Sequence, residues 1–286
     1  MKLAQRLRGR RGSGKANLRW STIPAAETHQ YAGLVPKLIA QEVDGMTITG
    51  VFSPEEVQRV LARSDELRST ASVQTFGAML PMPLNMIGDV SQDRTPYLDE
   101  TDRAQPIYVD AFGFDPHQRV AEVIGPMLGD YRVCPASEGG RPYNPGNLRW
   151  YDPGKGGLKA HAGNEFVPLV AEGAMSHLLT TTKVVNHMSY FVVLKRPESG
   201  GTLSVFDLLW RDHNNHETGW DSANRDDSFF DTVPCLRNDP GPGDMILFGG
   251  GWRWHRVDPV QGSTPRITYG GFMSEAVTGD ELHMFS

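Results

Sequence analysis

The chain has 286 residues, of which 39% are hydrophobic and 22% are charged, and its formal net charge is −6 at pH 7. This composition is typical of a folded domain with its own core and excludes a largely disordered chain. No run approaches the ~20 apolar residues of a membrane helix, and the two cysteines are too few for a disulfide framework. We therefore expect a cytoplasmic protein without a membrane partner.

The N-terminal segment is basic, with seven Lys and Arg residues and no acidic residue before position 20. Its glycines interrupt any helix, and it lacks the apolar stretch of a secretory signal. Short charge blocks at chain ends are more often solvated than bound to nucleic acid, and the rest of the chain is acidic. We predict a disordered basic tail over residues 1–22, a single domain over residues 23–286, and no nucleic-acid partner.

The elements after the tail are mixed. Residues 44–52 alternate like a strand, and residues 53–56 (Ser-Pro-Glu-Glu) have the N-cap serine, proline and acidic first turn of a helix start. Residues 76–88 hold three methionines and two prolines, a pattern too irregular for a regular helix or a central strand. These methionines fill a core or line an adaptable pocket, and the sequence does not distinguish the two. A second helix, interrupted at Gly125 and Pro126, is predicted over residues 117–128.

The C-terminal half has the regular β pattern, in which short β-branched and aromatic runs alternate with glycine- and proline-rich turns. The predicted strands are Asn147–Asp152, Met188–Arg196, Thr202–Leu209, Met245–Phe248, His255–Val257 and Arg266–Met273. Short antiparallel strands with such turns favour a mainly β protein with flanking helices, and the architecture that fits best is a double-stranded β-helix, or jelly roll.

A metal motif is incomplete at one position. Non-heme Fe(II) oxygenases bind iron with two histidines and one carboxylate, and the carboxylate stands two residues after the first histidine. Here His161 is followed at that position by Gly163, and His255 is the candidate for the distant histidine. The sequence predicts Fe(II) on His161 and His255, with Gly163 leaving a coordination position for an exogenous anion such as chloride. In the alternative, Glu165 supplies the carboxylate from a longer loop.

Arg266 and Thr268 form an Arg-x-Thr pattern at the start of the last predicted core strand. A charged guanidinium with a hydroxyl two residues further on the same strand face suits the distal carboxylate of 2-oxoglutarate. The alternative is an exposed strand arginine. His177 and His187 have no partner at ligand spacing, so we expect them to be structural.

These motifs resemble those of the freestanding Fe(II)/2-oxoglutarate-dependent aliphatic halogenases that chlorinate hapalindole- and welwitindolinone-type alkaloids. The similarity covers most of the chain from about residue 30 onward. The matching stretches are His161–Phe166, Ser189–Phe191 with Pro197–Gly201, Pro240–Phe248, His255–Val257, and Pro265-Arg266 through to Gly270–Phe272. Residues 211–238 do not match, and we expect them to form a lid.

The resemblance implies further site residues. Arg149 assists Arg266 in holding 2-oxoglutarate, and Ser189 lies near the catalytic face. Substrate-pocket positions of the family fall on Leu80, Met86 and Leu158. Glu165 stands where the alkaloid enzymes carry aspartate, which leaves the metal chemistry intact and the substrate open.

The expected reaction is chlorination of an unactivated sp3 carbon of a freestanding small molecule. With chloride bound and O2 as co-substrate, an Fe(IV)-oxo species removes a hydrogen atom, and the carbon radical then takes the halide if it lies nearer to it than to hydroxide. A hydroxylase of the same fold and a non-catalytic jelly-roll binding protein are the alternatives. No feature demands a substrate tethered to a carrier protein, so none is expected.

Overall fold

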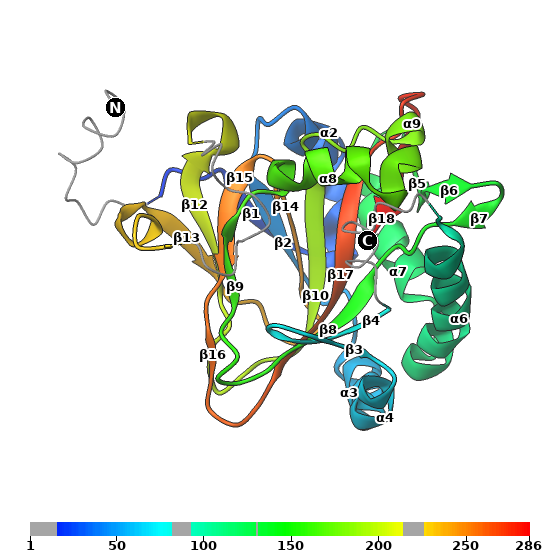
Figure 1. Ribbon diagram of the computed structural model, residues 1–286. Coiled ribbons are helices and arrows are strands. Elements are labelled where there is room, and N and C mark those ends of the chain that lie inside the picture. Colours follow the sequence, from blue (N-terminus) through cyan, green and yellow to red (C-terminus); the bar gives the residue numbers. More distant parts are fainter. Residues whose placement is uncertain (1–15, 82–92, 130, 214–225) are drawn as a thin grey trace.

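The computed structural model describes residues 16–81, 93–129, 131–213 and 226–286. Two β-sheets pack against each other (Figure 1), a ten-stranded sheet and a four-stranded sheet with the order β13-β12-β15-β9. The larger sheet consists of β1 (Trp20–Pro24), β2 (Gly45–Thr49), β3 (Ser72–Gln74), β4 (Gly77–Leu80), β5 (Arg132–Pro135), β8 (Asn147–Tyr151), β10 (Met188–Lys195), β14 (Met245–Phe248), β17 (Arg266–Glu275) and β18 (Glu281–Phe285). The smaller sheet consists of β9 (Leu158–His161), β12 (Leu203–Leu209), β13 (Cys235–Asn238) and β15 (Arg253–Val257).

Helices cover the outer face of the larger sheet (Figure 1). They are α2 (Leu34–Ile39), α3 (Pro54–Ala62), α4 (Ser64–Ser69), α6 (Thr95–Phe112) and α7 (Pro116–Ile124). Two short helices, α8 (Val167–Glu172) and α9 (Leu178–Thr181), follow β9. Along β17, Ile267 and Tyr269 join the helices in the main core, whereas Arg266 and Thr268 point to the opposite face, because successive strand side chains alternate. That inner face is shared with the smaller sheet.

The jelly-roll prediction is confirmed. Each predicted strand of the C-terminal half is present, with bounds that differ by at most two residues. The predicted start of α3 is also present: the Ser53 hydroxyl accepts from the Glu56 amide (3.2 Å) and the Glu56 carboxylate accepts from the Ser53 amide (2.8 Å). The predicted helix over residues 117–128 is α7 followed by a 3-10 turn, Gly125–Met127.

The predicted tail over residues 1–22 is wrong at its C-terminal end, while residues 1–15 lie outside the described part. Trp20 begins β1, which pairs with β2 in parallel, and its indole packs against Phe248. The Arg19 side chain pairs with Asp44. The basic segment itself contains no acidic residue, but in the folded chain Asp44 pairs with its last arginine, Arg19.

Two further expectations need correction. Within the segment 76–88, Gly77–Leu80 form β4 between β3 and β8, before the first proline, and residues 82–88 lie outside the described chain. The expected lid, residues 211–238, ends in β13, and Phe230 is buried with Phe206 and Trp254, so this part belongs to the smaller sheet. Residues 214–225 of the lid lie outside the described chain.

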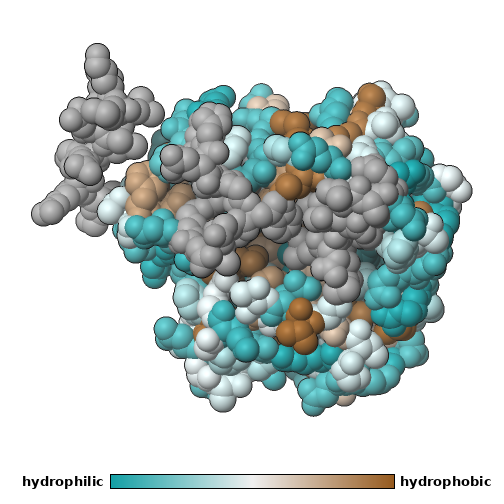
Figure 2. Space-filling view, viewed as in Figure 1, coloured by the Kyte–Doolittle hydropathy of each residue, from teal (hydrophilic) through white to brown (hydrophobic). Residues whose placement is uncertain are grey.

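Few large hydrophobic side chains of the described residues are exposed. On the face shown in Figure 2, hydrophilic residues predominate and the hydrophobic patches are separate. The large hydrophobic side chains that are exposed in the described chain are Val73, Val109, Val185 and Val277. Within the same residues, no helix combines the length and apolarity needed to cross a bilayer.

Candidate active site

His161 and His255 face each other between the sheets. They are register partners on the antiparallel strands β9 and β15, so their side chains leave the same face of the smaller sheet. Their ring centroids are 4.1 Å apart, with an interplanar angle of 55°. His255 is buried and His161 is half-buried. The two histidines that are 94 positions apart in the sequence therefore form one side of a site.

Both rings are oriented for metal binding through Nε2. Nδ1 of His161 lies 2.7 Å from the Lys159 carbonyl oxygen, and Nδ1 of His255 lies 2.9 Å from the Arg253 carbonyl oxygen. A carbonyl only accepts hydrogen bonds, so Nδ1 carries the proton and Nε2 the lone pair. Burial and the neighbouring His161 hold the pKa of His255 well below its usual value. The ring is therefore neutral at pH 7, as a metal ligand requires.

Gly163 lies in the loop after His161 and is held by the turn between β14 and β15. Its amide donates to the Gly250 carbonyl (2.8 Å), and the next amide, of Asn164, donates to the Gly251 carbonyl (3.0 Å). A Cβ built on Gly163 would overlap Cε1 and Nε2 of His187 and lie 3.2 Å from Gly251 Cα. The His187 ring therefore occupies the space that a side chain at position 163 would need.

No protein carboxylate completes the histidine pair within the described residues. Three His, Cys, Asp or Glu residues could share a metal ion if their ligand atoms all lay within 4.8 Å of one another. No such group among the described residues contains His161 and His255, so Glu165 does not supply the third ligand in this conformation. The one such group in the described chain is Cys134, Glu281 and His283 on β5 and β18. Both nitrogens of His283 already have partners, Thr182 (2.7 Å) and Glu281 (3.1 Å).

Arg266 is a buried cation that makes no ion pair with a described carboxylate. It is 4% exposed, and its guanidinium carbon lies 5.2 Å from the ring centroid of Tyr151 and 4.9 Å from that of Phe191. Burial lowers its pKa, but an arginine stays charged at pH 7. No ion pair joins it to a carboxylate anywhere in the described chain. A buried charge of this kind is expected to receive a bound anion.

Arg149 and Thr268 lie near Arg266, and Ser189 lines the same cavity further along, opposite Phe272 of β17. Arg149 and Thr268 are register partners on β8 and β17, and Ser189 lies on the neighbouring strand β10. Nε of Arg149 is buried without a hydrogen-bond partner among the described residues. A Cβ at Gly250 would overlap the Ser189 hydroxyl, so the glycine-rich turn lets this strand approach the site. Two cations and two hydroxyls therefore converge on one cavity.

The cavity is lined by both polar and apolar side chains. It is lined by the metal-ligand candidates His161 and His255 and by the predicted Arg149, Leu158, Ser189, Arg266 and Thr268, together with Tyr151, Tyr190, Phe191, Leu203, Phe248, Val257, Gly270, Gly271 and Phe272. Leu80 is instead buried in the main core, where the helices cover the larger sheet. Met86 lies outside the described residues. Sequence reasoning missed Tyr151 and Phe191 because their role depends on which strands become neighbours.

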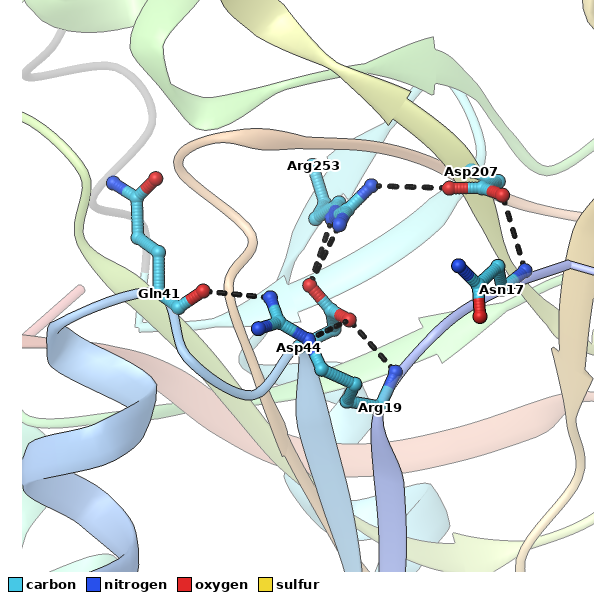
Figure 3. A network of polar contacts seen from close by, with 6 residues as sticks. All are labelled: Asn17, Arg19, Gln41, Asp44, Asp207 and Arg253. Atoms are coloured by element: carbon cyan, nitrogen blue, oxygen red, sulfur yellow. Dashed lines mark hydrogen bonds and ion pairs between the residues drawn. The ribbon is translucent and has the colours of Figure 1, made fainter.

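A buried ion-pair network supports the strand that carries His255 (Figure 3). Asp44 is 1% exposed and accepts from the Arg253 guanidinium (2.7 Å) and from the Arg19 amide (2.7 Å). Burial alone would raise the pKa of Asp44, but these donors outweigh it, and the pKa is lowered. Arg253 also reaches Asp207 at 3.5 Å. Since the Arg253 carbonyl holds Nδ1 of His255, the network fixes the imidazole through the backbone.

The donor set fits Fe(II) and 2-oxoglutarate. Two imidazoles whose Nδ1 atoms are held by backbone carbonyls suit Fe(II), and the two arginines of the same cavity suit a dicarboxylate. Comparison with solved structures finds an N-substituted L-amino acid dioxygenase from Burkholderia ambifaria AMMD, with a TM-score of 0.54 at 13% identity over 92% of this chain and 91% of that chain. The same dioxygenase in complex with alpha-KG gives a TM-score of 0.56 at the same identity and coverage. A search of curated proteins gives no match.

The fold is therefore that of the Fe(II)/2-oxoglutarate-dependent oxygenases, a class of jelly-roll enzymes. Within this class, the model of one family, described as carrier-protein-independent halogenase WelO5, matches residues 17–286. The chain belongs to this family, and the resemblance found in the sequence is confirmed. It is an Fe(II)/2-oxoglutarate-dependent enzyme.

Proposed function

We propose that this enzyme is a halogenase that chlorinates an unactivated sp3 carbon of a freestanding small molecule. The observation that carries the proposal is Gly163, which stands where a carboxylate ligand would be, beside two histidines that lack a third protein ligand within the described residues. The family description, a carrier-protein-independent halogenase, supports both the halide and the free substrate.

Each residue has a defined task in this proposal. His161 and His255 would hold Fe(II) through Nε2, and the position beside Gly163 would receive chloride. Arg266 would pair with the distal carboxylate of 2-oxoglutarate, helped by the Thr268 hydroxyl and Arg149. When bound, iron and 2-oxoglutarate supply the chemistry that activates O2, abstracts a hydrogen atom and transfers chlorine to carbon.

The cavity walls would position the substrate. Leu158 extends from the same strand as His161, and the other apolar lining residues are Phe191, Leu203, Phe248, Val257 and Phe272. These side chains suit an apolar molecule and exclude water from the reacting carbon. The distance of that carbon from the halide, which the walls set, would decide between chlorination and hydroxylation.

The test is a spectroscopic titration without oxygen. Fe(II) and 2-oxoglutarate are added to the protein, and the metal-to-ligand absorption band is recorded with and without chloride. A band that shifts with chloride supports the halogenase. A band that is indifferent to chloride indicates a hydroxylase of the same fold, and the absence of a band indicates a binding protein. Mass spectrometry of products from candidate substrates would follow, with bromide as a mass-shifted control.

A further inference from the structure

His187 occupies the space beside Gly163 in a fixed orientation. Its side chain is 5% exposed and packs edge-on against Phe272, with ring centroids 4.9 Å apart at 75°. Its backbone carbonyl accepts from the Gly251 amide (2.8 Å). Because a Cβ on Gly163 would overlap Cε1 and Nε2, this edge of the imidazole stands where a side chain at position 163 would begin.

The proton of His187 is on the far side of the ring. Nδ1 lies 2.9 Å from the Val184 carbonyl oxygen, which can only accept, so Nδ1 is the donor. Burial lowers the pKa of His187 to about 4, and the ring is neutral at pH 7 with a lone pair on Nε2. Nε2 is buried and has no hydrogen-bond partner in the described chain. A buried acceptor of this kind is stabilised by a ligand that donates a hydrogen bond to it.

We propose that His187 Nε2 accepts a hydrogen bond from a water molecule in the coordination position beside Gly163 and thereby sets how readily a halide replaces this water. The inference rests on the proposed function, because it concerns the same position. A metal-bound water is a strong donor toward a lone pair. Chloride has no proton to offer, and the same lone pair repels it. His187 is thus a positioning residue that favours water over halide.

The experiment compares chloride affinities of the wild-type, His187→Leu and His187→Gln proteins in the oxygen-free Fe(II) and 2-oxoglutarate complex. Leucine fills the space without a lone pair, and glutamine can turn an amide N–H toward the anion. Both variants should bind chloride about three- to tenfold more tightly, the effect expected of one hydrogen bond. The affinity for 2-oxoglutarate should change by less than about twofold, because the bonds of Arg266 are unaltered. If chloride binds measurably to all three proteins and no more tightly to the variants than to the wild type, the proposal is overturned.

His117→Gln is the matched control, since His117 is another buried neutral histidine, which contacts Tyr269 away from the metal position. It should leave the chloride affinity unchanged.

A second readout separates this proposal from the halogenase proposal. Near-infrared magnetic circular dichroism of the chloride-free complex distinguishes six-coordinate from five-coordinate Fe(II). The wild type should be six-coordinate with water, and His187→Leu should be five-coordinate. If no protein responds to chloride but the variant loses water, the halogenase proposal fails and the role of His187 stands. If chloride binds equally to all and the variant keeps its water, His187 has no such role and the halogenase proposal stands.

Discussion

Gly163 and His187 form a complementary pair at the scale of single residues. A missing ligand is usually described by the glycine alone, but here the space of its side chain is filled by an imidazole ring. That ring is held by Val184 on one side and by the edge of Phe272 on the other. A carboxylate therefore cannot be restored at position 163 by one substitution.

Gly163→Asp should destabilise the metal-free protein by roughly 1–3 kcal/mol, the usual cost of overpacking a filled site. It should also abolish the response of the absorption band to chloride. Combining it with His187→Ala should recover part of the lost stability, because the aspartate then has room. Urea unfolding of the wild type, the two single variants and the double variant measures the coupling free energy between positions 163 and 187. Strictly additive free energies would show that the two side chains do not compete for space.

Arg266→Met separates binding from stability. The dissociation constant of 2-oxoglutarate should rise at least about 30-fold, since removing one partner of a buried charge pair costs roughly 2–5 kcal/mol. The metal-free protein should be as stable as the wild type or more stable, because an apolar side chain replaces a buried cation that has no ion-pair partner among the residues the structure describes.

Thr268→Val is the control for Arg266, because it removes a single hydroxyl from the same strand face and should weaken 2-oxoglutarate by about tenfold or less. Calorimetric titration and thermal unfolding give the two quantities. A large loss of stability in Arg266→Met would mean that the arginine has a structural role instead.

At the scale of elements, the smaller sheet is attached to the larger one by ionic and glycine-mediated contacts around the site. Asp44 precedes β2 of the larger sheet, and its carboxylate binds Arg253 of β15. Its carbonyl accepts from the Gly249 amide (3.1 Å), the first residue of the turn that also contacts Gly163 and His187. One buried aspartate therefore connects the strand of His255 with the loop of Gly163.

Asp44→Asn should lower the free energy of unfolding by on the order of 3–5 kcal/mol, because it leaves the Arg253 guanidinium buried and poorly compensated. Asp207→Asn removes the other, more exposed partner of the same arginine and should cost about 1 kcal/mol or less. Urea unfolding of both variants, followed by an Fe(II) titration, makes the comparison. Equal losses of unfolding free energy in the two variants would mean that the buried Asp44–Arg253 pair stabilises β15 no more than the more exposed Asp207 contact does.

At the scale of the whole molecule, three buried histidines make folding sensitive to moderate acid. Burial lowers the pKa of His117 and His187 to about 4, and His255 is also well below its usual value. In the unfolded chain these groups take up protons near pH 6.5. Between pH 6.5 and about 4 these histidines are protonated in the unfolded state but not in the folded state, so the free energy of unfolding falls as the pH falls.

The metal-free protein should lose up to roughly 1.4 kcal/mol per pH unit for each of these histidines in that window. Asp44, whose pKa is lowered, adds its own loss only as the pH falls through and below its ordinary value of 3.8. Urea unfolding at pH 7.5, 6.0 and 5.0 measures the slope. The double variant His117→Gln, His187→Gln should show a shallower slope, and an unchanged slope would locate the acid sensitivity elsewhere.

Much of the architecture could be predicted from the sequence, since the strands that build the site have strong β-branched and aromatic patterns. His161, Gly163, His255 and Arg266 could be named because their spacing and residue types are informative by themselves. The 18-residue helix α6 was not predicted, because Pro106 interrupts its pattern. The location of His187 could not be predicted either: it depends on packing between the loop after β9, the glycine turn and β10.

The position of β9 at the end of the smaller sheet has a kinetic consequence. His161 is on this edge strand, whereas His255 is on β15, which has a neighbour on both sides. Edge strands open locally without unfolding of the whole protein. Backbone amides of β9 should therefore exchange with deuterium faster than those of β15 in the metal-free protein, and Fe(II) should slow them selectively. Release of a bound metal would then follow the fraying of one strand, at a rate set by local opening and not by the global stability of the fold.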